Sequence, residues 1–477
     1  MASPSSRRVA FVGSPVVAAA APPSASRGVR GRAGEDPGQR AGRRARANHR
    51  GRHRRPDPGL LGLVRRAASD HLLRGSVFGV AATAVTSLLG FGYWFLAARL
   101  VPAATVGYAS AVMSLVAGVG LLTGLGVNSL ILERLPPLEG TPQWVEVVSS
   151  WLWPTTLLAA AVSAVVVLAG HASRAPVSGL ELLVVMSTAS AGVVVLGILD
   201  RVFLSARRAD IGLLLAAATG VGKLASLLVL VVPGAALATL LGGWAVGVVA
   251  AAAAGCVLLV PRLRQGSLRL PQRWTKTREE LKRVFGHHLT SVGGLLTPYL
   301  LPTIVVYRLD ATHNAYFYAS WMLGSVFLII SPAVASSLFV EGARDVGALA
   351  RRTARALRIL ACLLPAPIIG AVVLGRPVLS LFGAGYAEHG YVLLMVLAAS
   401  SVPDAVTNIA VAILRVRGRL RLSAVLNLVM AVLALAGAWV LLPSLGVAGA
   451  GVAWCGAQAL GAVAVLPLLR TTLIGAA

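Results

Sequence analysis

The chain has 477 residues, of which 57% are apolar and only 13% are charged, and its mean hydropathy is +0.79. Soluble domains carry about 25% charged residues, so this composition excludes an ordinary soluble protein and predicts an all-α polytopic membrane protein. A formal charge of +26 would indicate a nucleic-acid partner in a soluble protein. In a membrane protein, the positions of the basic residues relative to the spans matter more than their total. We therefore expect no nucleic-acid partner.

Motifs for metal, cofactor or catalytic chemistry are missing from the sequence. Its three cysteines, Cys256, Cys362 and Cys455, fall in apolar segments without CxxC spacing, which predicts neither a disulfide framework nor a metal site. Nothing resembles a GxxxxGK phosphate loop, a DxD metal motif or a serine triad. We expect no cofactor, no metal and no catalytic residue, and the chain is predicted not to be an enzyme.

Composition divides the chain into five parts. Residues 1–58 are rich in Arg, Gly, Ala and Pro and can bury little apolar surface, which predicts a disordered cytoplasmic tail. Residues 59–74 have apolar side chains at helical spacing, as expected for an amphipathic helix at the membrane interface. A lobe over 75–260 and a second over 289–477 are predicted to hold six helices each, joined by a basic cytoplasmic linker over 261–288.

Apolar segments of roughly 20 residues predict twelve membrane-spanning helices. No loop on the outer side of the membrane is long enough to fold as a separate domain. The predicted spans are 75–98, 106–131, 150–170, 178–199, 211–232, 237–260, 289–307, 315–339, 356–374, 390–414, 422–442 and 447–469.

The distribution of Lys and Arg predicts the orientation. With the amino terminus inside, the inner segments close to the spans hold 25 of the 43 basic residues. The outer loops hold only Arg99, Arg174, Arg308 and Arg376. Basic residues favour the cytoplasmic side, so both termini are predicted to be cytoplasmic.

An offset of 210 residues relates the two halves. It pairs Tyr108-Ala109-Ser110 with Tyr318-Ala319-Ser320, and Trp244 with Trp454. Because tryptophan and tyrosine are rare in this Leu-, Ala- and Val-rich chain, these pairs predict an internal duplication. Two similar membrane halves joined in the middle are a common plan for transporters.

Two charged residues lie deep within predicted spans. Lys223 is 12 residues into the fifth span, about 18 Å at 1.5 Å per residue, and Asp404 reaches a similar depth in the tenth. Buried charges mark either structural ion pairs or substrate and ion paths. In the functional interpretation Lys223 attracts an anionic substrate and Asp404 couples to a proton or another ion. In the structural interpretation the two residues pair, or face small pockets in their own halves.

Further candidates lie near the outer face and at helix bends. Arg99 and Arg308 end the first and seventh spans; they could recognise phosphate or extend to the membrane interface. Tyr299 could stack on a sugar ring or belong to an interfacial aromatic belt. Three prolines are predicted to break or bend helices around a transport cavity and so contribute to gating, namely Pro298, Pro302 and Pro403.

Four segments resemble a known family, and the resemblance covers roughly residues 70–470. They are ARLVPAATVGYASAVMSL, GLGVNSLILERLP, PVLSLFGAGYAEHGYVLLMVLAAS (377–400) and LNLVMAVLALAGAWVLLPSLGVAGAGVAW (426–454). These are similar to segments of the polysaccharide and oligosaccharide flippases (Wzx-type, for lipid-linked O-units). That family belongs to the MOP superfamily, which also includes the MATE-like drug/cation antiporters and the lipid II flippase.

The resemblance implies two six-helix lobes related by a pseudo-two-fold axis, enclosing a cavity lined by the first, second, seventh and eighth spans. It also implies that alternating access moves a polyprenyl-pyrophosphate-linked oligosaccharide across the plasma membrane for cell-surface polysaccharide biosynthesis. Implied partners are this lipid-linked substrate, anionic lipids at the basic loops, H⁺ or Na⁺ as coupling ion, and glycan polymerase or glycosyltransferase machinery.

Two other functions remain as alternatives. A MATE-like drug/cation antiporter has the same fold but would normally need several acidic groups in its cavity, and Asp404 is the one found. A membrane polysaccharide polymerase or glycosyltransferase would normally carry a large outer loop or outer catalytic acids, and it would leave the duplication unexplained.

Overall fold

Helices account for nearly all of the chain that the computed structural model describes, which is 71–169, 177–230, 236–259 and 296–474. In lipid no water bonds the backbone N–H and C=O groups, and a helix satisfies all of them within one segment, so long apolar runs fold as helices. The predicted tail over 1–58, most of the amphipathic helix over 59–74 and the linker over 261–288 lie outside the described residues.

Each of the twelve predicted spans coincides with helical residues, although most helices are longer than predicted. Eleven segments of the described chain are long and apolar enough to cross a membrane. The described part of the seventh span is helical over 296–308. The helices of the first half are α3 (His71–Leu100), α4 (Ala103–Arg134), α5 (Pro142–Ala169), α6 (Gly179–Ser205), α7 (Ala209–Leu230) and α8 (Ala236–Leu259). Those of the second half are α10 (Ala311–Leu328), α11 (Ile330–Arg344), α12 (Leu349–Leu363), α13 (Pro365–Ser380), α14 (Ala384–Val416), α15 (Leu420–Leu445) and α16 (Ala448–Ile474).

Two spans that were predicted as single helices are interrupted. The eighth changes from α10 to α11 at Ile329, and the ninth changes from α12 to α13 at Leu364. Pro332 follows the first interruption and Pro365 follows the second. Proline lacks the N–H that would bond the carbonyl four residues earlier, so each helix ends and a new one begins. These prolines were the signal that the sequence prediction missed.

The helix bounds support the predicted duplication. Shifted by 210 residues, α4 becomes 313–344, against 311–344 for α10 with α11. The same shift moves α7 to 419–440, against 420–445 for α15, and α8 to 446–469, against 448–474 for α16. One offset therefore reproduces the bounds of several helices within a few residues.

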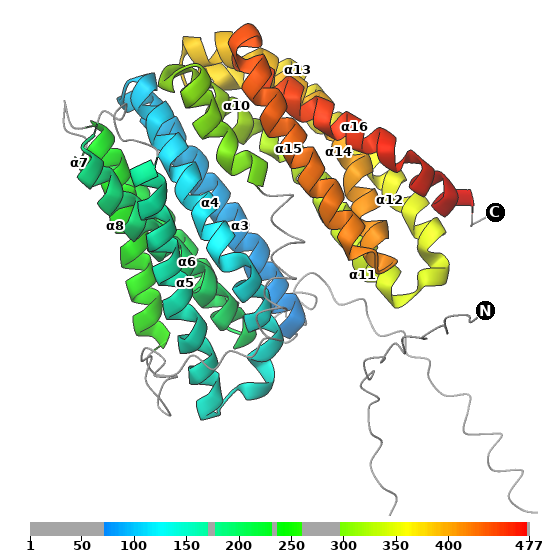
Figure 1. The fold of residues 1–477 in the computed structure, drawn as a ribbon, viewed down its shortest axis with the longest axis horizontal. Coiled ribbons are helices and arrows are strands. Elements are labelled where there is room, and N and C mark those ends of the chain that lie inside the picture. The colour runs from blue at the N-terminus through cyan, green and yellow to red at the C-terminus, as the bar shows by residue number, and fades with distance from the viewer. Residues whose placement is uncertain (1–70, 170–176, 231–235, 260–295, 475–477) are drawn as a thin grey trace, which may run out of the picture. The chain divides into compact units, whose positions relative to one another are not determined.

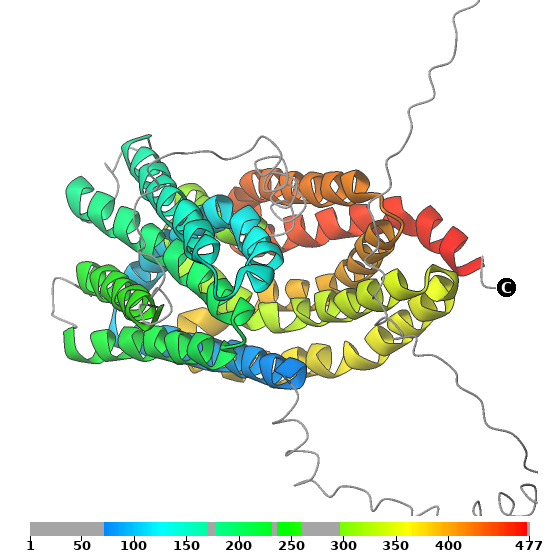
Figure 2. The ribbon, with the colours of Figure 1, turned by 90° about the horizontal axis from the view of Figure 1, so that it is seen from below.

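Packing is mostly within each half. In the first half α3 packs against α7, and α6 packs against α4, α5 and α8. In the second half α14 packs against α11, α13 and α16, and α15 lies beside α16 in both views (Figures 1 and 2). The main helix contact between the halves joins α4 to α10 (Figure 1).

Candidate functional site

The buried apolar residues show where the two halves share a core. One cluster contains residues of both halves, among them Tyr93 and Val106 of the first and Ala319 and Phe382 of the second. The ends of α4 and α11 that carry Arg134 and Arg344 belong instead to two separate clusters, one confined to each half. The halves therefore share a core towards the ends marked by Arg99 and keep separate cores at the opposite ends.

The first turns of α4 and α10 meet in a close polar contact. Asn314 is fully buried, and its Nδ2 donates hydrogen bonds to the Gly107 carbonyl oxygen at 2.7 Å and to Ser110 Oγ at 3.1 Å. A Cβ atom on Gly107 would lie only 1.6 Å from the Ala311 carbonyl oxygen. Only glycine at this position lets the two helices approach so closely.

Aromatic side chains and one arginine extend the contact between the halves. Trp94 packs edge-on against Tyr318 at 4.8 Å between ring centroids. Phe382 packs edge-on against Phe91 and Phe95, with ring centroids 5.4 Å and 5.7 Å apart. Arg99 was predicted as a phosphate-binding candidate, and its Nε donates a hydrogen bond to the Leu381 carbonyl oxygen at 2.6 Å. In this conformation Arg99 thus links the end of α3 to the end of α13.

Asp404 is almost fully buried in α14 and is surrounded by polar groups of the second half. The Ser331 hydroxyl at the start of α11 donates a hydrogen bond to Asp404 Oδ2. Asn408 Nδ2 donates to Ser331 Oγ at 3.3 Å and to the Asp404 carbonyl at 2.9 Å. Thr407 Oγ1 donates to Gln458 Oε1 of α16 at 2.8 Å. A buried carboxylate among oxygen and amide groups is suited to exchanging a proton or holding a small cation.

Lys223 of α7 has a different environment. Its Nζ lies 5.5 Å from the ring centroid of Trp244 on α8, a distance at which a cation–π interaction stabilises the ammonium group. Throughout the described ranges no carboxylate pairs with it. Lys223 and Asp404 form no ion pair with each other, so the structural interpretation in which they neutralise one another is wrong.

Arg308 contacts aromatic side chains of its own half. Its guanidinium carbon lies 4.8 Å from the ring centroid of Trp439, on which Tyr307 also stacks at 5.7 Å. Trp439 is 43% exposed and Tyr307 is 63% exposed, which favours an anchoring role at the membrane interface. Tyr299 is half-buried, and a Cβ built on Gly118 of α4 would lie 3.0 Å from its Cβ, so Tyr299 lies against the first half.

The three predicted helix-breaking prolines lie within continuous helix. Residues 296–308 are helical through Pro298 and Pro302, and α14 is helical through Pro403. The prediction of a broken seventh span is therefore wrong over these residues. Neighbouring helices can hold a proline-containing span in helical form although one backbone hydrogen bond is lost. A gating role for the three prolines stays a prediction.

Sequence reasoning missed several residues of the contact and of the polar network, namely Gly107, Ser331, Asn314 and Phe382. Each is an ordinary residue for its segment, so only its partner across the fold reveals its role. Asn314 offered one signal, since a buried amide within an apolar span needs a hydrogen-bond partner.

Comparison with known proteins shows the fold. No family model matches the sequence, and no curated protein matches it. A multidrug resistance MATE family transporter of the MOP superfamily, in an inward-facing conformation, has 15% identity and a TM-score of 0.64 over 83% of this chain and 98% of its own. The lipid II flippase MurJ, in an inward closed conformation, has 11% identity and a TM-score of 0.69 over 83% of this chain and 89% of its own.

A third solved structure extends this set. A MOP superfamily transporter from Pyrococcus furiosus has 16% identity and a TM-score of 0.57 over 85% of this chain and 95% of its own. All three similarities extend over most of both chains. The chain is therefore a multi-pass membrane protein with the fold of the MOP-superfamily transporters.

Proposed function

We propose that this protein moves a polyprenyl-pyrophosphate-linked oligosaccharide from the inner to the outer leaflet of the plasma membrane, for cell-surface polysaccharide biosynthesis. The observation that carries the proposal is Lys223, a lysine deep in a span with no carboxylate partner among the described residues. A charged group is costly in a membrane interior, so its presence there favours a place on a substrate or ion path. The pyrophosphate of the substrate is the anionic ligand of Lys223.

The contacts between the halves support an alternating-access mechanism. Under the orientation predicted from Lys and Arg, the shared core and the Asn314–Gly107 contact lie towards the outer side. The separate cores then lie towards the cytoplasm, where the substrate is made. In this state the protein accepts substrate from the inner leaflet. Transport requires the outer contact to open and the inner ends to approach each other.

The substrate's parts would occupy different environments. Lys223 and its aromatic neighbour Trp244 bind the pyrophosphate, because an ammonium group provides a strong point charge for phosphate oxygens. Tyr299 lies beside the first half and offers a ring on which a sugar can stack. The polyprenyl chain stays in the bilayer, which spares the protein the cost of enclosing it.

Asp404 supplies the coupling ion site. Protonation, or binding of Na⁺, neutralises its carboxylate and changes the hydrogen bond that Ser331 donates to it. Ser331 lies in the first turn of α11, next to the interruption after α10. A change at Ser331 therefore acts on the eighth span, whose first part, α10, contacts α4. The coupling ion thereby alters the relative stability of the two conformations.

A MATE-like antiporter is the second candidate, and the buried carboxylate of Asp404 with its neutral polar neighbours is the observation that favours it. In that case Asp404 would exchange H⁺ or Na⁺ against a cationic drug, and Lys223 would repel the drug. Glycan polymerase or glycosyltransferase machinery would be partners of the flippase and not of the antiporter.

The test is mass spectrometry of polyprenyl-linked glycans in a strain depleted of the protein, with the leaflet probed by an impermeant sugar-modifying enzyme. The flippase function predicts one intact oligosaccharide-lipid accumulating on the inner leaflet. Unchanged precursors together with raised drug sensitivity would favour the antiporter. Accumulation on the outer leaflet would indicate a polymerase or ligase.

A further inference from the structure

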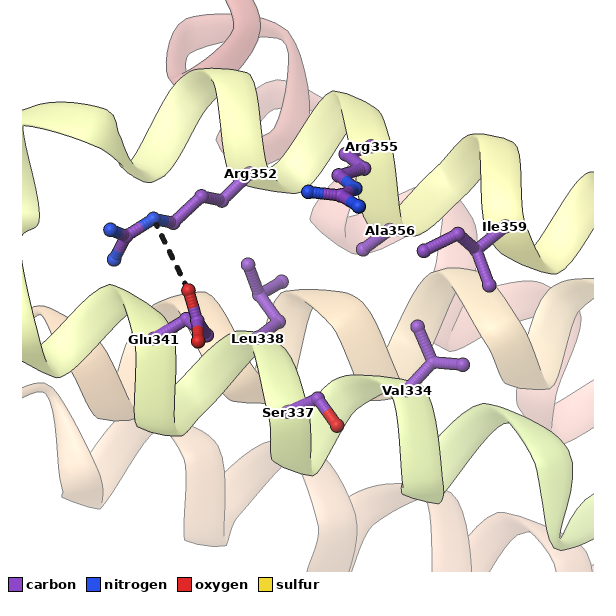
Figure 3. Close-up of a pocket in the computed structure, with 8 residues that line it drawn as sticks. All are labelled: Val334, Ser337, Leu338, Glu341, Arg352, Arg355, Ala356 and Ile359. Carbon is purple, nitrogen blue, oxygen red and sulfur yellow. Dashed lines mark ion pairs between the residues drawn. The ribbon is translucent and has the colours of Figure 1, made fainter. Parts of the chain in front are cut away.

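A pocket of about 530 Å³ lies between α11 and α12, next to the turn that joins these helices. Its eight lining residues come equally from the two helices, as Figure 3 shows. They are Val334, Ser337, Leu338 and Glu341 of α11, and Arg352, Arg355, Ala356 and Ile359 of α12.

The lining changes from charged to apolar along the pocket. Glu341 and Arg352 are close to the α11–α12 turn, while Val334 and Ile359 are at the other end (Figure 3). On each helix the lining residues span seven positions, which corresponds to about 10 Å along the axis. A pocket with this gradient matches a molecule that has a polar head and an apolar chain.

Helix lengths put the charged end at the membrane surface. The segment Leu349–Ser380 has 32 residues. As a straight helix it would measure about 48 Å, against a hydrocarbon core of about 30 Å. Its first turns carry the arginines of the pocket as well as Arg351 and Arg358, which suits the headgroup layer. Val334 and Ile359 then lie at the edge of the hydrocarbon.

The charged residues at the pocket indicate which kind of headgroup it binds. Arg352 lies between Glu341, with Nε to Oε2 at 3.9 Å, and Asp345, with Nη2 to Oδ2 at 3.8 Å. Its Nη1 is buried without a hydrogen-bond acceptor in the described part of the chain. Arg355 is exposed and makes no ion pair with any described residue. Two carboxylates therefore balance Arg352, and Arg355 is the guanidinium of the pocket lining that has no acid partner among the described residues.

We propose that this pocket binds an anionic phospholipid of the surrounding bilayer by its phosphodiester. Arg355 donates hydrogen bonds to the phosphate oxygens, and one acyl chain lies along Val334 and Ile359. The single negative charge of a phosphodiester matches this one guanidinium without an acid partner among the described residues, whereas a pyrophosphate carries more charge. The site is separate from the residues of the transport pathway proposed above, so it does not rest on the proposed function.

Native mass spectrometry of the full chain in detergent, titrated with phosphatidylglycerol or phosphatidylcholine, tests this site. We expect preferential retention of phosphatidylglycerol and an about tenfold loss of that retention in Arg355→Gln, since hydrogen bonds to charged groups are worth that much. Arg351→Gln is the matched control, because it removes the same charge from the same helix outside the pocket. It should change retention by less than about twofold.

A second variant examines the apolar end without touching a charge. Ile359→Trp fills the groove and should lower phosphatidylglycerol retention, while size-exclusion chromatography reports whether the protein is still folded. Equal retention of both phospholipids, or equal effects of Arg355→Gln and Arg351→Gln, would overturn the proposal. Retention of polyprenyl pyrophosphate that falls in Arg355→Gln, with no such fall for phosphatidylglycerol, would also overturn it. None of these readouts requires transport, so the site can fail while the proposed function stands.

Discussion

The two halves share one helix plan but differ in their buried charges. Lys223 lies about 21 Å along α7 from its start at Ala209, and Asp404 lies about 18 Å from the end of α14 at Val416. Under the predicted orientation both distances are measured from the cytoplasmic side. The residues at the duplicated positions, Leu433 for Lys223 and Val194 for Asp404, are apolar. Each charge is therefore specific to its half.

Their surroundings differ as much as their charges. Asp404 accepts a hydrogen bond from Ser331. Lys223 instead lies over the ring of Trp244 and has no acid partner in the described ranges. The two arginines Arg99 and Arg308 differ in the same way, since Arg99 bonds to the other half and Arg308 packs within its own. The first half thus holds a cation beside an aromatic ring, and the second half holds a carboxylate within a polar network.

The largest effect is expected where the halves touch. Gly107→Ala places a methyl group where the Ala311 carbonyl lies, so α4 and α10 must separate. We expect transport close to background in the inner-leaflet accumulation assay. Gly124→Ala is the matched control on the same helix, because its added Cβ would meet only Nδ2 of Asn128, at 3.8 Å. Equal activity of the two variants would contradict the importance of the α4–α10 contact.

The second-largest effect on transport is expected from the loss of the proposed ion site. Asp404→Asn removes the titratable group while keeping the size of the side chain, and we expect transport to fall by about tenfold or more because a hydrogen-bonded charge is lost. The dependence of the remaining rate on pH or Na⁺ should disappear as well. Wild-type transport in well-expressed Asp404→Asn protein would remove Asp404 from the coupling mechanism.

Lys223→Met tests the other half of the comparison. Removal of a phosphate-binding charge should raise the apparent KM for the lipid-linked oligosaccharide by about tenfold, with a smaller change in kcat. Lys223→Arg keeps the charge and should restore most of the affinity. If Lys223→Met changed only protein stability, the lysine would be a structural residue held by Trp244.

Smaller effects should distinguish the two arginines. Arg99→Gln removes one hydrogen bond across the halves, which corresponds to about 1 kcal/mol and an about fivefold shift towards the outward-open population. Distance measurements between spin labels on the outer ends of α4 and α10 can follow this shift. Arg308→Gln should leave the distances unchanged, and similar shifts in both variants would contradict the asymmetry.

The smallest effect concerns the start of α10. Partial burial raises the pKa of Asp310, but hydrogen bonds from the backbone and side chain of His313 outweigh it and lower the pKa below its usual value. Asp310→Ala removes this N-cap and should cost about 1 kcal/mol of stability. Because a lowered pKa keeps the carboxylate ionised, the difference in thermal stability should not shrink between pH 7 and pH 5. A difference already lost at pH 5 would contradict this.

Much of the fold could be predicted from the sequence, because a membrane-spanning helix needs only an apolar segment of sufficient length. Apolar length alone locates a membrane helix, and one offset reveals the duplication, so α4 and α8 could be predicted within a few residues. The interruptions at Ile329 and Leu364 were missed because proline can either bend a helix or end it. Lys223 and Asp404 could be found by depth. Asn314 and Ser331 could not, because their importance depends on partners 207 and 73 residues away.

The central claim is that the protein carries a lipid-linked oligosaccharide across the bilayer. The most direct measurement reconstitutes the purified full chain in liposomes that hold the oligosaccharide-lipid isolated from depleted cells. An impermeant sugar-modifying enzyme then reports how much substrate reaches the opposite leaflet. We expect protein-dependent movement that Asp404→Asn and Lys223→Met slow strongly. Movement no faster than in protein-free liposomes, under an applied H⁺ or Na⁺ gradient, would contradict it.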